Sequence, residues 1–548
     1  MSTLIAIIPI VLLFVLMLAF KMPGWKSALY TLIATVLLAL FASPALGMVP
    51  ERFAAESIWG VVGWSLVEGV WKALFPILII IMMALYSYNI LLKTGQIELI
   101  KHQFTSISSD KGVVVLLLTW GFGGLLEGMA GFGTAVAIPA AILIGLGFKP
   151  VFSALVSLIA NTVAVAFGAV GVPVTTLCNE VTAGGAAPAE LIMQTSSYIV
   201  IQLALLFFLV PFIILMITDR KAIWKNLALS LWTGVISLAV QYVCARFLGA
   251  ETPAIVGSLA AIIAIIAYAK LFDRRSGQQP SAPLPPRTEP AQKTAQNPLP
   301  GPAADAAPAP RYTLAESLRA WSVYIFILIF ILLSGALIPS VNHFLGTHLV
   351  TKAVLPVIGS TVVFKWIANA GLMLFLGATL GGLVQGMSLK ALMVLLADTV
   401  VRNRKTIITI VSLISISSVM NNSGMINQIA LGLVALTGGL YPFFAPLIGA
   451  IGTFVTGSDT SANILFGKLQ ANVAGQLGFG PDQTTWLVGS NTTGATGGKM
   501  ISPQSIAIAT AACDMEGKDG EILKAAIPYA ILYIVIGGLF VYFGLGLL

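Results

Sequence analysis

Long apolar runs follow one another along almost the whole chain, separated by short polar segments. Most runs hold about 20 residues, which is the length an α-helix needs to cross the hydrocarbon core of a bilayer. The predicted spans are 4–20, 27–46, 73–92, 150–173, 190–217, 226–247, 254–271, 320–341, 366–386, 406–437, 485–512 and 525–547. With two interrupted segments, at 112–147 and 442–475, the pattern predicts an all-α polytopic membrane protein of about 12 transmembrane helices plus two re-entrant hairpins.

Composition agrees with this class. Of 548 residues, 58% are hydrophobic and 9% are charged, against about 25% charged residues in soluble proteins. The net charge of +8 reflects Lys and Arg gathered in loops on one side of a membrane. It is therefore no sign of a nucleic-acid partner, and membrane lipid is the expected surrounding. The three cysteines form no ligand or disulfide pattern.

Basic residues also predict the topology. Lys21 and Lys26 lie between the first two spans, and an Arg-Asn-Arg-Lys cluster occupies 402–405. Since cytoplasmic loops carry the excess of Lys and Arg, both termini are predicted outside. Residues 273–311, rich in Pro, Ala and Gln, are predicted to form a disordered cytoplasmic linker between an N-terminal half (1–272) and a C-terminal half (312–548). Reading 112–147 as two full spans would leave this topology unchanged.

The two halves share an ordered set of residues. An Asn-Thr pair is followed by a glycine and a proline, seven and twelve residues after the asparagine: Asn161, Thr162, Gly168 and Pro173, then Asn491, Thr492, Gly498 and Pro503. An acid precedes each asparagine, Glu127 by 34 residues and Asp459 by 32. Six predicted spans separate the two pairs, so the repeats are expected to cross in opposite senses. Inverted repeats with broken helices are typical of secondary transporters.

Polar and ionisable residues in these apolar stretches predict a site for a small polar or anionic solute. An ionisable group at membrane depth costs roughly 2.5–3.5 kcal/mol, so it normally faces a cavity or a partner. The candidate proton-coupling residues are Glu127 and Asp459. The candidate substrate-binding residues are Gly131, Gly133, Thr134, Asn161, Thr162, Ser458, Thr460, Asn463, Asn491, Thr492 and Lys499.

Each candidate also has a plainer interpretation. The glycines can serve helix packing, and the Asn and Thr side chains can satisfy the carbonyls of broken helices. Asp459 can be only a helix cap, while Lys499 can pair with substrate, pair with an acid or extend to the membrane interface. Glu127 is the preferred proton carrier, because the Ala-Gly-Phe-Gly beside it offers no side chain to hold it ionised. Asp459 has Ser458, Thr460 and nearby N–H groups to stabilise its charge.

Several functional classes lack their signatures. The sequence contains no Walker A motif, no dinucleotide fingerprint in a βαβ context and no cluster of metal ligands. It also contains no persuasive nucleophile–base pair. We therefore expect no cofactor, no bound metal and no enzymatic activity. The oligomeric state is not determined by the sequence.

Long motifs resemble those of the L-lactate permease family, which includes relatives that carry glycolate. The matching stretches are LLEGMAGFGTAVAI, GLGFKP, LIANTVAVAFGAVGVP, TGSDTSANILFGKLQ and GGKMISPQSIAIA. The resemblance implies proton-coupled uptake of L-lactate, D-lactate and glycolate across a bacterial plasma (inner) membrane. Departures are a short loop between the spans at 320–341 and 366–386, and the small residues of AVAIPAA and NTVAVAF. They concern substrate preference.

Two alternatives remain open at this stage. One is a sodium-coupled carboxylate transporter of similar hairpin architecture, and the other is an anion channel. Dicarboxylates would require more than one fixed cation in the core, and Lys499 is the one identified.

Overall fold

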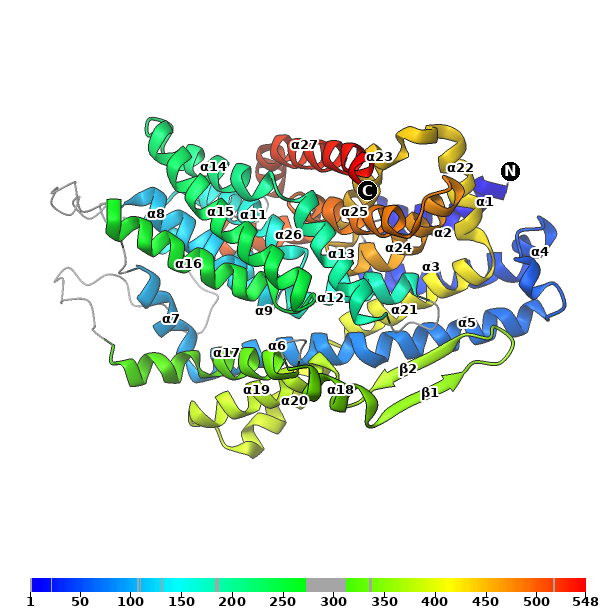
Figure 1. Cartoon of the computed structure of the whole chain (residues 1–548), viewed down its shortest axis with the longest axis horizontal. Helices are drawn as coiled ribbons and strands as arrows, with labels where there is room; N and C mark the ends of the chain where they lie inside the picture. Colours follow the sequence, from blue (N-terminus) through cyan, green and yellow to red (C-terminus); the bar gives the residue numbers. More distant parts are fainter. Residues whose placement is uncertain are drawn as a thin grey trace.

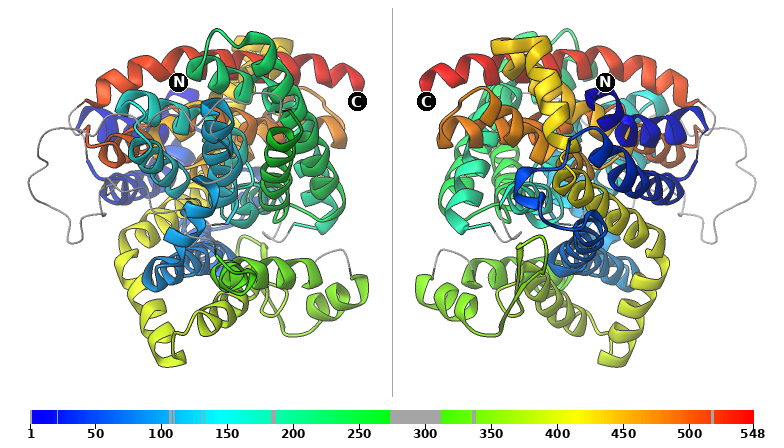
Figure 2. Two further views of the ribbon diagram at one scale, coloured as in Figure 1. Left: turned by 90° about the vertical axis from the view of Figure 1, so that its left-hand side faces the viewer. Right: turned by 90° about the vertical axis from the view of Figure 1, so that its right-hand side faces the viewer.

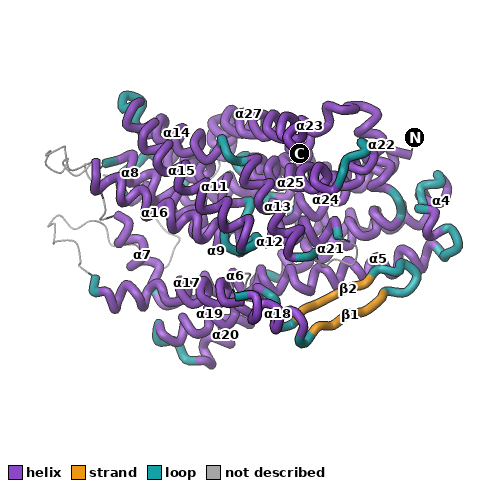
Figure 3. Tube along the Cα trace, viewed as in Figure 1, coloured by secondary structure: helices purple, strands orange, loops and turns teal. Residues whose placement is uncertain are grey.

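The computed structural model describes residues 2–20, 22–105, 108, 110–129, 131, 133–182, 187–272, 312–334, 338–515 and 518–548. These residues form a body of helices with one small β-hairpin (Figures 1 and 3). The predicted helical membrane-protein class is confirmed by this content and by the apolar helices below. The predicted linker at 273–311 lies outside the described residues.

The first half consists of α-helices joined by π-helical turns and one 3-10 turn. Its elements are α1 (Ser2–Ala6), α2 (Ile8–Phe14), η1 (Val15–Ala19), α3 (Gly24–Leu37), η2 (Leu38–Ala42), α4 (Ser43–Ala45), η3 (Glu51–Phe53), α5 (Ile58–Lys72), η4 (Ala73–Leu78), α6 (Ile79–Thr94), α7 (Gln96–Thr105), α8 (Lys111–Leu116), η5 (Leu117–Gly123), α9 (Gly124–Met129), α10 (Thr134–Gly145), α11 (Pro150–Val165), α12 (Gly168–Val181), α13 (Ala189–Gln202), α14 (Leu206–Thr218), α15 (Ile223–Phe247) and α16 (Pro253–Phe272).

The second half adds the β-hairpin. Its elements are α17 (Leu314–Ser334), α18 (Pro339–Thr347), β1 (Val350–Val354), β2 (Thr361–Lys365), α19 (Ala370–Val384), α20 (Leu389–Arg402), α21 (Arg404–Asn422), α22 (Met425–Thr437), η7 (Gly438–Leu440), α23 (Tyr441–Thr456), α24 (Asp459–Gln476), α25 (Pro481–Lys499), α26 (Pro503–Ala512), α27 (Asp519–Gly544) and η8 (Leu545–Leu547). The strands pair antiparallel, with Val350 opposite Lys365 and Val354 opposite Thr361. Sequence analysis expected only a short loop there.

By length and apolar composition, eight helices in the described part of the chain could cross a membrane, or up to ten if each of two bent pairs counts as one span. The predicted number was about 12 plus two hairpins. Three apolar stretches, Ser2–Met17, Thr134–Gly145 and Gly371–Val384, form shorter helices instead. An apolar run therefore need not form one bilayer-length helix.

One predicted loop is wrong. Residues 47–72, which are of mixed charge, separate the predicted spans 27–46 and 73–92 and so were expected to form a loop, but helix runs from Ile58 to Thr94 over 37 residues. Glu68 and Lys72 lie four residues apart on this helix and pair at 2.9 Å, so the charges that suggested a loop satisfy each other. The helix bends at Phe75, which has a non-helical backbone (φ −127°, ψ 108°) just before a proline.

Both predicted hairpins have antiparallel arms. In the first, a Cβ placed on Gly123 would lie 3.2 Å from the carbonyl oxygen of Ala135 in α10. In the second, a Cβ on Gly452 of α23 would lie 2.9 Å from the Ala462 side chain in α24. Broken helices accompany both hairpins, since α11 and α12 meet at 48° and residues 500–502 separate α25 from α26. The inverted relation between the halves stays a prediction.

The helices form two layers. One layer contains α5, α6, α17, α19, α20 and the β-hairpin, along the lower edge of Figure 1. Within it α17 packs on α19, and α19 on α6. The larger body above contains the hairpins and broken helices, and it contacts the first layer through α21 against α5 and α12 against α6. The end views place α27 on the far side of this body, away from the first layer (Figure 2).

Glycines bring α23 and α25 into backbone contact. A Cβ on Gly449 would overlap the Asn491 carbonyl, one on Gly494 the Pro446 carbonyl, and one on Gly498 the Ala450 carbonyl. Small residues allow such close approach between membrane helices. This contact fixes the second hairpin against the broken helix that follows it.

We expect Gly494→Ala to lower the unfolding temperature, because the added methyl group has no space beside Pro446. Overpacking of this kind costs about 1–3 kcal/mol. Gly475 of α24 is the matched control, since a Cβ there meets no atom within 4 Å. Thermal unfolding of both purified variants in detergent measures the effect. Equal unfolding temperatures for the two variants would contradict the packing argument.

Candidate functional site

A cavity of about 470 Å³ lies where the two hairpin tips meet the two broken helices. It receives residues from both halves of the chain. Seven predicted site residues line it: Glu127, Gly131, Gly133, Ser458, Asp459, Thr460 and Lys499. The two matching stretches of sequence therefore contribute to one cavity, although more than 300 residues separate Glu127 from Asp459.

Four helices begin at this cavity. Its lining includes Gly133 before α10, Gly168 of α12, Asp459 of α24 and Pro503 of α26. The first N–H groups of a helix have no partner inside the helix, and the peptide dipoles place a partial positive charge there. Helix starts gathered around one cavity favour an anion.

Local sequence explains where three of these helices start. Ser458 caps α24, because its hydroxyl accepts a hydrogen bond from the Ser461 N–H at 3.2 Å. Ser502 caps α26 in the same way, by accepting a hydrogen bond from the Ser505 N–H at 3.2 Å. Gly133 precedes α10 with φ +86°, a left-handed conformation that glycine adopts without strain. A Cβ on Gly133 would also overlap Ile508 of α26, so this hairpin tip packs closely on that helix.

The fourth start lies at a strained break. Ala169 and Val170 have φ of 45° and 58°, although both carry a Cβ. Left-handed backbone at non-glycine residues costs on the order of 1–3 kcal/mol each and persists where the surroundings impose it. Gly168 explains part of the constraint, because a Cβ there would lie 2.7 Å from Glu127 Oε1. The break is thus packed directly on the acid of the first hairpin.

Glu127 and Lys499 form a buried ion pair across the cavity wall. Lys499 Nζ lies 2.8 Å from Glu127 Oε1, and the two side chains are 11% and 2% exposed. Lys499 could pair with substrate, pair with an acid or extend to the membrane interface, and in this conformation it pairs with an acid. The argument that nothing beside Glu127 holds it ionised is wrong, because the partner comes from the other half of the chain.

Asp459 was expected to have hydrogen-bond donors around its carboxylate, and the structure places none there among the described residues. It is 2% exposed, and neither carboxylate oxygen has a hydrogen-bond partner in the described part of the chain. The neighbouring Ser458 hydroxyl serves the Ser461 N–H instead. Asp459 is therefore the first residue of α24 rather than its cap.

Three predicted site residues lie in a buried network beside the cavity rather than in its lining. Asn463 Nδ2 donates to Thr492 Oγ1 at 2.8 Å and to the Pro173 carbonyl at 3.0 Å. Asn491 Nδ2 donates to Asn463 Oδ1 at 2.9 Å, and Gln470 Nε2 donates to Asn491 Oδ1 at 3.2 Å. These bonds join α12, α24 and α25, so the amides fix helices to one another.

The remaining predicted residues lie near the cavity. Asn161 and Thr162 line a small crevice that also contacts Lys499. Both polar atoms of the Asn161 side chain are buried without a hydrogen-bond partner among the described residues. Thr134 Oγ1 donates to the Gly131 carbonyl at 2.9 Å and so closes the turn at the first hairpin tip.

Sequence reasoning missed part of the cavity lining. Gln504 and Ser505 at the start of α26 line it, and so do Lys405 and Thr409 of α21. The Ser-Pro-Gln-Ser motif was a usable signal, because Ser-Pro before a helix is typical of an N-terminus. Nothing in the local sequence of α21 places it at the cavity.

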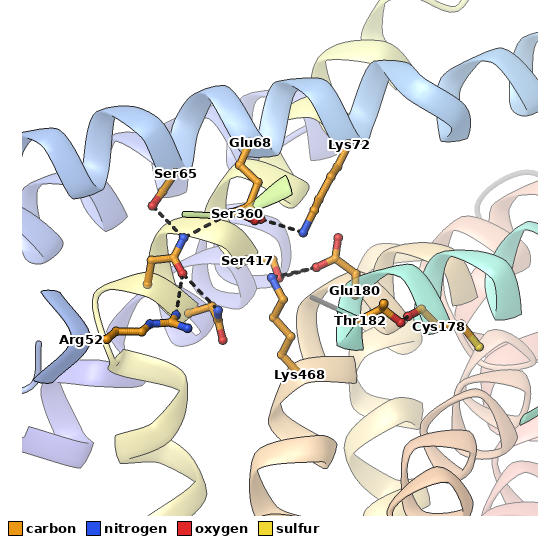
Figure 4. Close-up of polar contacts among 12 residues, drawn as sticks. Arg52, Ser65, Glu68, Lys72, Cys178, Glu180, Thr182, Ser360, Ser417 and Lys468 are labelled. Atoms are coloured by element: carbon orange, nitrogen blue, oxygen red, sulfur yellow. Dashed lines mark hydrogen bonds and ion pairs between the residues drawn. The ribbon is translucent and has the colours of Figure 1, made fainter. Parts of the chain in front are cut away.

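A second group of buried charges was also missed (Figure 4). Glu68 pairs with Lys72 at 2.9 Å, and Glu180 pairs with Lys468 at 3.2 Å. All four residues are at most 8% exposed. Glu180 lies between the predicted spans 150–173 and 190–217 and so was expected in a loop, but it belongs to α12. The usable signals were the four-residue spacing of Glu68 and Lys72 and the position of Lys468 in the apolar stretch 464–469.

Comparison with known proteins assigns the family. The family profile described as L-lactate permease matches residues 2–547. An L-lactate permease of Streptococcus iniae is 36% identical over 88% of this chain and 92% of its own. The glycolate permease GlcA of Escherichia coli is 32% identical over 98% of this chain and 95% of its own. An L-lactate permease of Bacillus subtilis is 33% identical over 98% of this chain and 94% of its own.

A solved transporter structure also aligns with the chain. The YdaH transporter of Alcanivorax borkumensis is 12% identical, with a TM-score of 0.47 over 95% of this chain and 98% of that one. The profile match and the permease relatives, each extending over most of the sequence, establish that the chain belongs to the L-lactate permease family.

Proposed function

We propose that the protein is a secondary transporter that takes up small 2-hydroxymonocarboxylates together with protons. The proposed substrates are L-lactate, D-lactate and glycolate. The observation that carries this proposal is the cavity at which four helices begin and which Glu127, Asp459 and Lys499 line. The names of the matched relatives, L-lactate permease and glycolate permease, support the substrate class.

A small monoanion suits the chemistry of this cavity. The free N–H groups of helix starts bind a carboxylate without a side-chain charge. Lys499 supplies one ammonium group, and hydroxyls of Ser458, Thr460 and Ser505 lie in the lining for a second oxygen. A dicarboxylate would bring a second negative charge beside Lys499, which an acid already neutralises, and the other lysine of the lining, Lys405, is exposed.

Competition for Lys499 gives a route to proton coupling. In this conformation Glu127 Oε1 lies 2.8 Å from Lys499 Nζ and balances its charge. A bound carboxylate needs the same ammonium group, so Glu127 would lose its partner while buried. Taking up one proton removes the charge of Glu127, and the substrate replaces it on Lys499. One anion and one proton then enter together, and the net charge of the cavity is unchanged.

Asp459 fits this scheme as an uncharged donor. A buried carboxyl group without hydrogen-bond partners is accommodated at lower cost in its protonated form. Asp459 begins α24 beside the backbone N–H groups that are proposed to bind the substrate. A protonated carboxyl group there can donate a hydrogen bond to a substrate oxygen. Its charge then need not change during transport.

Electroneutral entry also has an energetic advantage. A lone anion moving into a negative interior works against about 2.3 kcal/mol per 100 mV. A proton carried with the anion cancels that term and adds the pH gradient as a driving force. This argument favours a proton symporter over an anion channel, which would let lactate leave along the potential.

We infer the side to which this cavity opens from residues of its lining. Its lining includes Met22 and Trp25, between the first two predicted spans, and the exposed Lys405. Both segments carry the basic residues that predict a cytoplasmic position. We therefore assign this conformation an opening toward the cytoplasm of a bacterial inner membrane, with both termini outside.

The first test uses the purified protein in liposomes. An inward proton gradient is expected to drive accumulation of labelled L-lactate, and a sodium gradient alone is not. Unlabelled D-lactate and glycolate should reduce the uptake, whereas succinate and citrate should not. Uptake that requires sodium, or that never exceeds equilibrium, would overturn the proposal.

Glu127→Gln is expected to abolish accumulation driven by the proton gradient while lactate exchange at equal pH persists, because a neutral amide mimics the protonated acid. Asp459→Asn is the matched comparison and should keep proton-driven accumulation at a reduced rate. The measurement is uptake against counterflow in the same liposomes. If the Gln variant still accumulates lactate and the Asn variant does not, the coupling role belongs to Asp459.

Lys499→Met is expected to lower lactate uptake at least tenfold, since buried charge pairing to substrate is worth about 1.5–3 kcal/mol. Lys499→Arg should recover only part of the rate, because a guanidinium fork differs from a compact ammonium group. Lys524 of α27 is exposed, and Lys524→Met serves as the control with normal uptake. Normal uptake by the Lys499→Met variant would exclude a role for this amine.

A further inference from the structure

The Glu180–Lys468 pair joins the two helices that lead away from the cavity. Glu180 lies in α12 and Lys468 in α24, with Nζ and Oε2 3.2 Å apart. Ser417 of α21 donates a hydrogen bond to the same carboxylate at 3.2 Å, as Figure 4 shows. The pair thus connects the first half of the chain to the second.

Two further contacts show that α12 and α24 lie side by side and run in the same direction. Near the cavity, Asn463 Nδ2 donates to the Pro173 carbonyl at 3.0 Å. Farther along, a Cβ on Gly467 would lie 2.7 Å from Leu177 Cδ1. The Glu180–Lys468 pair is the outermost of these contacts, so the first turns of both helices lie at the cavity and their later turns meet at the ion pair.

The ion pair acts on the cavity only through these helices. Neither Glu180 nor Lys468 is among the lining residues. Lys468 follows Asp459 by nine residues, which corresponds to roughly 13 Å along a helix. A shift or rotation of α24 against α12 at the ion pair would therefore move Asp459 and the neighbouring N–H groups within the cavity.

The neighbouring Glu68–Lys72 pair is complete within α5. Its acid also accepts hydrogen bonds from Ser360 at 2.8 Å and Asn422 at 3.2 Å. Glu68 also interacts electrostatically with Lys468, and Lys72 with Glu180, so the two pairs form one cluster of four buried charges. Within that cluster, the direct contact between Glu180 and Lys468 is the one that joins α12 to α24.

We propose that Glu180 and Lys468 are positioning residues of the transport site: their ion pair holds α12 and α24 in register and so fixes their first turns around the substrate. The proposal rests on the proposed function, because its transport readout needs a carried substrate. Removing one charge takes away the direct partner of the other and leaves one unbalanced charge in the buried cluster, and helices that can slide are expected to shift to relieve it.

The test compares single and double variants in liposomes, with uptake normalised to folded protein. Lys468→Met and Glu180→Gln are each expected to raise the KM for lactate on the order of tenfold. The double variant lacks both charges, so its KM should lie closer to that of the unchanged protein than either single variant. Asp398→Asn is the control, since its pair with Arg402 is 3.9 Å long and largely exposed, and its KM should not change.

A second readout does not depend on the substrate. Thr460 lines the cavity, and the three native cysteines are buried, so a Thr460→Cys protein can be labelled with a small thiol reagent. Adding Lys468→Met is expected to change the labelling rate severalfold. If the protein carries no lactate but this change occurs, the proposed substrate is wrong while the positioning role stands.

A pair that only stabilises the fold gives a different result. Its removal would lower the unfolding temperature and the amount of folded protein, with the KM and the labelling rate unchanged. That outcome would overturn the proposal, and so would a double variant whose KM rises by the product of the two single changes.

Discussion

A buried ammonium or carboxylate group is costly unless an opposite charge lies within reach, and this constraint governs how the two halves of the chain fit together. Glu127 and Glu180 belong to the first half, and their partners Lys499 and Lys468 belong to the second. Neither half could bury these charges alone. Assembly of the two halves therefore satisfies the charges and builds the cavity in the same step.

Around this constraint, the backbone supplies much of the chemistry. Helices that stop at the cavity expose N–H groups there, which would be unfavourable in lipid but suits a site that receives an anion. Glycine and serine set these ends, as Gly133 and Ser458 illustrate. The strained residues Ala169 and Val170 belong to the same wall. Strain concentrated beside the ion pair is consistent with a region built for its function rather than for stability.

The polar residues of the predicted site divide into two groups. Glu127, Asp459 and Lys499 line the cavity, whereas Asn463 and Asn491 bond to each other behind it. The second group gives the cavity wall a fixed shape, because each amide has specific partners on neighbouring helices. Under the proposed function, binding and support are thus carried by residues that look alike in sequence.

The sequence by itself determined the membrane class, the two helical hairpins and seven of the residues that line the cavity, because these follow from local apolar length, glycine and cap residues. Tertiary structure alone decided the partners of the charges. Glu127 and Lys499 lie 372 positions apart, so no local pattern could show that they pair. Glu180 and its partner Lys468 are also far apart in the sequence, so Glu180 was assigned to a loop: a buried charge and an exposed one look alike until the partner is in place.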